Sequence, residues 1–249
     1  MVDPTMPLFN NLIPLYLYQG GVIPRPTYEY DYIIASQGVI KRLETEVVSA
    51  DMILVPFYTE LRGLYLQLYP LNVVFKLPRI PWYLLEQVLV DARTNAHLEF
   101  MYHFRFMGGQ WHVTFPEQNQ EEAWVGYYNV DPTGIALDLH SHNGMPPFFS
   151  PTDNKDERGG RFYGVIGYVD SPTPQIVLRL GMHGHWLINV PALLLFENIG
   201  PFVEIFLEQE VPHYGHAEME IGGNNGHEAF TPGFLSANLL EKLTQLFRK

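Results

Sequence analysis

The sequence has no cysteine among its 249 residues. This absence excludes a disulfide framework, thiol catalysis and every metal site that uses cysteine ligands. A metal site in this chain must therefore be built from His, Asp and Glu. The absence also fits a reducing compartment, and we expect the protein to be cytoplasmic.

Basic residues are scarce, since 15 Lys and Arg stand against 27 Asp and Glu and the formal net charge is −12. Nucleic-acid binding relies on clustered Lys and Arg, so this balance argues against nucleic acid as the main partner. The sequence has no uninterrupted apolar run of about 18 residues, the length of a membrane span. Residues 1–14 lack the basic start and apolar run of a signal peptide. We expect neither nucleic acid nor a membrane as a partner.

Hydrophobic residues make up 47% of the chain, which is enough for a real core. Residues 1–78 are rich in Pro, Tyr and Leu and carry no motif, so we expect a small α+β accessory region there. Apolar runs at residues 32–34 and 52–55 predict strands, whereas residues 39–47 fit either a short helix or a strand. The prolines around residue 79 mark a joint, because proline removes a backbone donor and disfavours helix before it.

Residues 79–249 have the pattern of a larger second domain. Apolar side chains recur at helical spacing over residues 82–94, which predicts an amphipathic helix. Residues 97–107 and 110–115 alternate around Gly108-Gly109 and predict a hairpin. We expect a loop at residues 116–122 and in the Gly-rich segment 222–226. Further strands are predicted at residues 123–128, 135–140, 163–169, 176–180 and 185–190, and a C-terminal helix at residues 237–247. This mixture predicts the α/β (α+β) class, with one mixed β-sheet flanked by helices.

Two histidines two residues apart end the predicted strand at residues 135–140. Residues two apart in a strand point to the same face, so His140 and His142 can direct both imidazoles to one ion. Neutral imidazole is the commonest zinc ligand in proteins. A lone His-x-His, however, is often only a surface pair.

A helix-start pattern follows these histidines after seven residues. Ser150 suits the N-cap, Pro151 suits the first helical position, and Asp153 then stands at the third. A carboxylate there can accept hydrogen bonds from the free amides of the helix start, or turn toward a nearby cation. Ser-x-x-Asp is a common capping pattern on its own, but together with the histidines it forms a specific composite.

The composite His140-x-His142, seven residues, Ser150-x-x-Asp153 resembles the signature of the JAMM (JAB/MPN) zinc metallopeptidases. The resemblance covers about residues 81–200. It implies a JAB/MPN core, which is similar to the cytidine-deaminase fold, and a Zn²⁺ ion held by the two histidines and the aspartate. It further implies that Ser150 stabilises the tetrahedral intermediate and that an upstream Glu holds the catalytic water.

Glu99 fits the upstream position of the family, because it follows the predicted helix at residues 82–94 and opens the predicted strand. Glu86 is the main competitor, but it lies in the middle of the predicted helix. Glu121 and Glu122 fall in the predicted loop and are expected to be solvated. We therefore expect Glu99 to be the general base.

The resemblance implies hydrolysis of a peptide or isopeptide bond, as in deubiquitinases or in the processing of ubiquitin-like precursors. Its implied partner is a ubiquitin-like protein or its conjugate. More narrowly, residues 139–153 resemble a bacterial group of JAMM proteins called PRTRC system protein A, which are encoded beside a ThiF-like activating enzyme. A ThiF-like protein is therefore a second implied partner.

Two positions depart from the usual JAMM pattern. Asn143 follows the second histidine where many members have proline, and Tyr102 stands three residues after Glu99 where many have glycine. Neither change removes a ligand. Both lie in segments that shape the substrate groove, so the substrates of the eukaryotic deubiquitinases do not carry over directly.

Three other classes of protein compete with this interpretation. Asp138-Leu-His-Ser-His142 also resembles the first motif of PHP-type phosphoesterases and amidohydrolases, but about 107 residues remain, fewer than a barrel needs. A non-catalytic JAMM-like module that binds a ubiquitin-like partner is possible, although such members typically lose ligands. A zinc nucleoside deaminase requires cysteine ligands, which this chain lacks.

The remaining acidic and histidine candidates are assigned no role. Asp138 could orient an imidazole, but nothing in the sequence places it in contact with one, and Asp156 and Glu157 are expected at a solvated helix end. His183 and His185 flank a glycine, which favours a turn. The histidines of the acidic, Gly-rich C-terminal segment are expected to lie in solvated loops: His213, His216 and His227.

Overall fold

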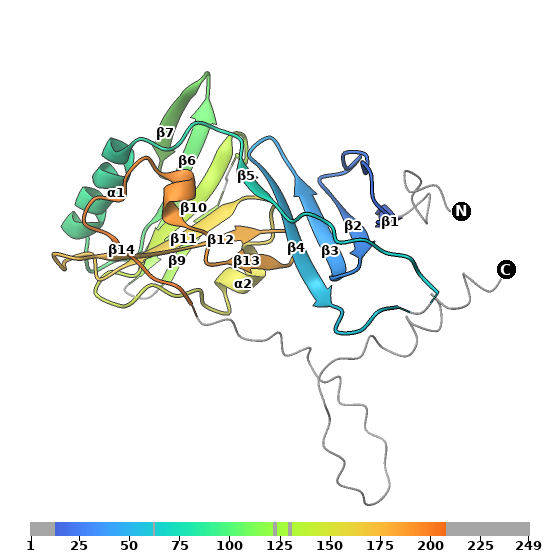
Figure 1. The fold of residues 1–249 in the computed structure, drawn as a ribbon. Coiled ribbons are helices and arrows are strands. Elements are labelled where there is room, and N and C mark those ends of the chain that lie inside the picture. Colours follow the sequence, from blue (N-terminus) through green and yellow to red (C-terminus); the bar gives the residue numbers. More distant parts are fainter. Residues whose placement is uncertain (1–12, 62, 122–123, 129–130, 208–249) are drawn as a thin grey trace, which may run out of the picture. The chain divides into compact units, whose positions relative to one another are not determined.

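The computed structural model describes residues 13–61, 63–121, 124–128 and 131–207. Within these ranges the chain forms two larger β-sheets, one two-stranded sheet and few helices, so the expected mixed α/β class is confirmed at this level (Figure 1). None of the helices in the described ranges is both long and apolar enough to cross a membrane. The predictions for residues 213, 216, 222–226, 227 and 237–247 concern segments outside the described residues.

The first sheet is formed by residues before the proline joint. Its strand order is β1-β2-β3-β4-β5, with β1 parallel to β2 and the other pairs antiparallel. The strands are β1 (Leu15–Leu17), β2 (Tyr30–Ala35), β3 (Gly38–Glu44), β4 (Val48–Pro56) and β5 (Val73–Phe75). Residues 39–47, which fit either a helix or a strand, thus contribute residues 39–44 to the strand β3. The expectation of an α+β region is wrong for the described part of residues 13–78, which contains strands and no helix.

The second sheet follows the joint and has the order β13-β12-β11-β10-β6-β7, with β14 also paired to β12. Only the pairs β10–β11 and β12–β14 are parallel, so the sheet is mixed. Its strands are β6 (Met101–Met107), β7 (Gln110–Thr114), β10 (Ile135–Ser141), β11 (Phe162–Gly167), β12 (Gln175–Gly181), β13 (Trp186–Ile188) and β14 (Val203–Glu204). The predicted hairpin is confirmed, and both Gly108 and Gly109 take the positive φ that its two-residue turn requires.

Besides shifts of one or two residues at strand ends, the structure differs from the sequence prediction at two places near the site. The predicted loop at residues 116–122 is wrong, because β8 (Glu117–Glu121) pairs antiparallel with β9 (Trp124–Tyr128). The sequence of β8 is polar and lacks apolar alternation, so only its pairing with β9 identifies it as a strand. The strand predicted from residue 97 begins only at Met101, so Glu99 precedes β6 instead of opening it.

The helix α1 (Trp82–Thr94) has the predicted bounds. Pro81 precedes it in an extended conformation, and its apolar side chains are buried on one stripe: Leu84, Leu85, Val88, Leu89 and Ala92. The Tyr102 hydroxyl donates a 3.0 Å hydrogen bond to Asp91 Oδ2 and so ties the sheet to α1. Because side chains alternate along β6 and β10, α1 covers the face of Tyr102, and His140 points to the opposite face. Two one-turn helices complete the fold, α2 (Asp153–Asp156) and α3 (Ala192–Leu195).

The two larger sheets contribute to one apolar core. Leu43, Val48 and Ala50 from the first sheet belong to the same buried cluster as Leu85 of α1 and Leu137 of β10. The Phe75 and Phe162 rings also meet edge to face, with centroids 5.7 Å apart. The proposed division into residues 1–78 and 79–249 stays a prediction, and this shared core couples the first part to the second.

A buried lysine joins the sheets through a polar contact. Lys41 is 1% exposed, and its Nζ donates a 2.9 Å hydrogen bond to the His183 carbonyl. The same Nζ lies 3.3 Å from His185 Nδ1 and 4.2 Å from the Tyr30 ring centroid. Because burial disfavours the charged ammonium, the pKa of Lys41 is lowered to about 8.

This lowered pKa predicts a pH-dependent stability. The unfolded lysine titrates near pH 10.4, so between about pH 8 and 10.4 the unfolded chain binds more protons and folding stability rises with pH. Lys41 alone contributes at most about 1.4 kcal/mol per pH unit in this window. We expect urea denaturation from pH 8 to 10 to show this rise in the wild type and a smaller one in Lys41→Met. Lys76→Met, at a partly exposed lysine paired with Glu44, is the control and is expected to keep the wild-type slope. Equal slopes in the wild type and Lys41→Met would contradict the assignment.

Candidate metal centre

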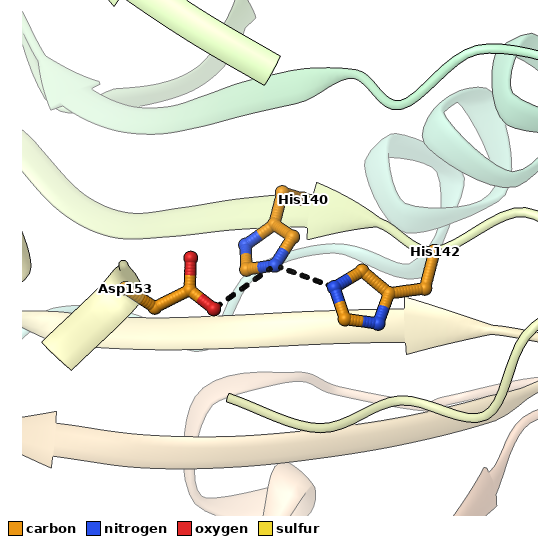
Figure 2. A group of neighbouring side chains, drawn as sticks. All are labelled: His140, His142 and Asp153. Atoms are coloured by element: carbon orange, nitrogen blue, oxygen red, sulfur yellow. Dashed lines mark hydrogen bonds and ion pairs between the residues drawn. The ribbon is translucent and has the colours of Figure 1, made fainter. Parts of the chain in front are cut away.

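Two buried imidazoles meet where β10 ends. His140 stands near the end of this strand and His142 directly follows it, and the two residues are 3% and 4% exposed. Their Nε2 atoms lie 3.2 Å apart, and Figure 2 shows both rings turned toward one another. The predicted convergence of the two histidines is therefore present.

The carboxylate of Asp153 approaches the same point from another element. Asp153 is the first residue of α2, not the third as predicted, and its Oδ2 lies 3.9 Å from His140 Nε2 (Figure 2). The capping contacts expected around Ser150 are present. The Asp153 N–H donates to Ser150 Oγ over 3.2 Å, and the Ser150 N–H donates to Asp153 Oδ2 over 2.5 Å. This reciprocal pair fixes Ser150 and Asp153 as one unit.

The loop after His142 selects the tautomer of that histidine. The Pro146 carbonyl lies 3.2 Å from His142 Nδ1, so this nitrogen carries the proton and Nε2 presents its lone pair to the site. The loop runs close to the end of β11, where a Cβ on Gly167 would lie 2.3 Å from the Met145 carbonyl oxygen. Only glycine fits there.

The departure from proline after the second histidine has a backbone explanation. Asn143 has a φ of 46°, in the left-handed region. Asn tolerates this region, whereas the proline ring holds φ near −65°. Proline at this position would therefore require a different path for the loop that carries Pro146.

The electrostatic surroundings favour metal ligation. Burial lowers the pKa of both His140 and His142, which keeps the imidazoles neutral and their lone pairs available at neutral pH. The ligand atoms of His140, His142 and Asp153 all lie within 4.8 Å of one another. This group of two neutral nitrogens and one carboxylate could hold a metal ion.

Glu99 lies beside this group but outside it. Its Oε1 is 4.0 Å from His142 Nε2, and it is not part of the three-residue set whose ligand atoms converge. Burial, and then the negative charge of Asp153, raise the pKa of Glu99 to about 7. Its competitor Glu86 is exposed on α1, on the other face of the sheet.

Hydrogen bonds fix the segment that carries Glu99 against the histidine strand. The Phe100 N–H donates to Ser141 Oγ over 3.1 Å, and the Ser141 N–H donates to the Phe100 carbonyl over 3.0 Å. On the other side, Gln118 of β8 accepts from the Met101 N–H over 2.8 Å. Glu99 is thus held by its neighbours in the chain at a set distance from His140 and His142.

An aromatic side chain covers part of the site. The Phe148 ring meets the His142 ring edge to face at 4.5 Å between centroids, and Phe148 remains 42% exposed. Sequence reasoning assigned it no role. Its only sequence signal is its place in the seven-residue gap between the second histidine and Ser150.

The other acidic candidates divide into two groups. Asp138 lies 3.6 Å from His103 Nε2 and 3.6 Å from Arg161 Nη1, and neither of these ion pairs involves His140. Asp156 is exposed, as expected. The expectation for Glu157 is wrong, because it is 3% exposed and forms a 2.6 Å ion pair with Arg179. The sequence does contain a signal for this pair. Arg179 is the one charged residue in the apolar strand β12, and a buried charge in such a strand indicates a buried partner of opposite charge.

The second His-x-His forms a turn, as predicted. His183 and Gly184 both have positive φ, and the Met182 N–H donates to the His185 carbonyl over 2.8 Å. His183 Nε2 forms a 2.7 Å ion pair with Glu29, which directly precedes β2. Among the described residues, this pair belongs to no group of three metal ligands.

Comparison with known proteins gives no relative on which to rest the site. A scan against protein-family models finds no match, and a search of curated proteins finds no significant similarity.

Proposed function

We propose that the chain is a zinc-dependent peptidase of the JAMM type that hydrolyses a peptide or isopeptide bond. One observation carries the proposal. His140, His142 and Asp153 converge from β10 and α2 with Glu99 beside them, in the chain order and spacing of the JAMM motif. His140, His142 and Asp153 are the proposed metal ligands, and Glu99 and Ser150 are the proposed catalytic residues.

The donor set fits zinc. Two ligands at about 2.0–2.1 Å in tetrahedral geometry are about 3.3 Å apart, close to the 3.2 Å between His140 Nε2 and His142 Nε2. Asp153 Oδ2 lies 3.9 Å from His140 Nε2, and all three ligand atoms lie within 4.8 Å of one another, so the carboxylate would have to move closer to both nitrogens to complete the ligand set. Three protein ligands leave a fourth position for water, which is the arrangement of catalytic zinc sites.

When bound, zinc supplies Lewis-acid chemistry and lowers the pKa of its water toward about 7. Glu99 takes the proton of the attacking water and later delivers it to the leaving amine. Its carboxylate suits this role because it is 5% exposed, lies beside the ligands and has a pKa raised to about 7, where a carboxylate can both accept and return a proton near neutral pH.

Ser150 is suited to stabilise the charge that develops on the carbonyl oxygen. Its Oγ accepts from the Asp153 N–H, so its own hydroxyl proton can be donated to the substrate. A preoriented donor of this kind acts on charge that is present only in the transition state. The capping unit with Asp153 keeps this hydroxyl beside the metal ligands.

We propose the C-terminus of a ubiquitin-like protein, or its conjugate, as the substrate, and a ThiF-like activating enzyme as a further partner. The resemblance of residues 139–153 to the bacterial JAMM proteins supports both. A PHP-type or amidohydrolase activity is less well supported, because those motifs stand on a barrel strand and β7 and β13 end an open sheet here. A JAB/MPN core fits a mixed sheet with α1 on one face and the ligands on the other.

The proposal is tested by incubating the full chain with ubiquitin-like proteins, each extended by a short C-terminal peptide. Mass spectrometry follows cleavage with and without a chelator, and elemental analysis measures zinc. We expect one zinc per chain and cleavage that stops on chelation and returns with added zinc. Bound zinc without cleavage of any substrate would favour the non-catalytic module. Hydrolysis of small phosphoesters would favour the PHP-type reaction.

A further inference from the structure

The element that carries Asp153 has little to hold it in place. The helix α2 is a single turn, and none of its residues is buried. An isolated turn of helix is unstable in water, because its nucleation costs more conformational entropy than its few hydrogen bonds return. Some contact outside α2 must therefore fix Asp153 and Ser150 in front of His140.

Arg179 makes that contact from β12, a strand of the same sheet as β10. It lies on β12, is 3% exposed, and donates from Nε and Nη2 to Glu157 Oε2 over 2.9 and 2.6 Å. Its Nη1 donates to Asn154 Oδ1 over 2.6 Å. Asn154 directly follows Asp153, and Glu157 directly follows the last residue of α2, so one guanidinium holds both ends of the turn.

The guanidinium is itself fixed by aromatic rings. It lies 3.8 Å from the Phe149 ring centroid and 4.9 Å from that of Trp186. Phe149 directly precedes Ser150, so Arg179 contacts the chain on both sides of the Ser150–Asp153 unit. Trp186 also donates from Nε1 to the Glu157 carbonyl over 3.0 Å. Stacking and a planar set of donors are properties of arginine that lysine does not share.

We propose that Arg179 is the positioning residue of the metal centre, fixing α2 so that Asp153 completes the ligand set and Ser150 faces the substrate. This inference rests on the proposed function. Arg179 touches neither the metal nor the substrate; it acts through Asn154, Glu157 and Phe149. A ligand already held in place loses less entropy on metal binding, and partners outside the ligand set commonly change metal affinity 10–100-fold.

The test compares Arg179→Lys with Arg105→Lys in the full chain. Arg105 is a matched control, because it is buried on the same sheet and also makes three hydrogen bonds, to Thr114 Oγ1 and to the carbonyls of Thr133 and Asp131. Zinc dissociation constants are measured by competition with a chromogenic chelator, at a temperature where circular dichroism shows both variants folded. We expect Arg179→Lys to raise the zinc Kd about 10–100-fold and Arg105→Lys to leave it unchanged.

A second variant keeps the test decisive if Arg179→Lys is too unstable to measure. Asn154→Ala removes one exposed acceptor and is expected to raise the zinc Kd about 2–10-fold.

The outcomes separate this inference from the proposed function. Wild-type zinc affinity in Arg179→Lys and Asn154→Ala, or an equal loss in Arg105→Lys, would show that Arg179 supports only the general fold. If the wild type itself binds no zinc, the proposed function fails.

Discussion

Glu99→Gln is expected to abolish hydrolysis while leaving one zinc bound per chain. Gln fills nearly the same volume in this buried position but cannot accept the proton of the attacking water. A general base contributes about 10²–10⁴-fold to rate, so kcat/KM should fall by at least about 100-fold. Zinc stays because Glu99 is not one of the three converging ligands.

The measurement pairs a cleavage assay with elemental analysis of the same protein sample. Glu86→Gln is the matched control, since Glu86 is exposed on α1 and is expected to keep wild-type activity. Full activity of Glu99→Gln would reject its role as base. Loss of zinc from Glu99→Gln would instead make Glu99 a fourth protein ligand and leave no position for water.

His140→Ala and Asp153→Asn are each expected to lose both zinc and hydrolysis. Each change leaves only two protein ligands of full strength, and zinc sites are built from three or more. Asn is chosen at position 153 because its oxygen can still accept the hydrogen bond from the Ser150 N–H. This variant therefore removes the ligand charge while keeping the start of α2.

Thermal unfolding with and without added zinc supplies a second readout. A ligand at 100 times its Kd stabilises a folded protein by about 2.7 kcal/mol, so zinc should raise the Tm of the wild type and not that of the two variants. His112→Ala, at an exposed histidine on β7, is the control and is expected to respond like the wild type. A zinc-induced Tm rise in His140→Ala equal to that of the wild type would place the ion elsewhere.

The parts of the site that sequence could predict are those set by local geometry. Period-two alternation placed His140 and His142 together, and the capping pattern placed Ser150 next to Asp153. The helix α1 also follows from its apolar spacing. In each case the residues that interact are near neighbours in the chain.

The parts that sequence could not predict depend on contacts between distant residues. Glu157 looked like a solvated helix end, but an arginine 22 residues away pairs with it inside the protein. The polar segment of β8 looked like a loop, yet it pairs with β9. The sequence of the accessory region does not predict that Leu43 packs in a core shared with the second sheet, or that Lys41 donates a hydrogen bond to the His183 carbonyl. Nothing in the local pattern determines these pairings.

The central claim is that His140, His142 and Asp153 bind one zinc ion. Anomalous diffraction from crystals of the full chain, recorded on both sides of the zinc absorption edge, tests it most directly. We expect a single strong peak between the Nε2 atoms of the two histidines and the Asp153 carboxylate. Crystals grown with zinc that show no peak there, or show one only at other residues, would contradict it.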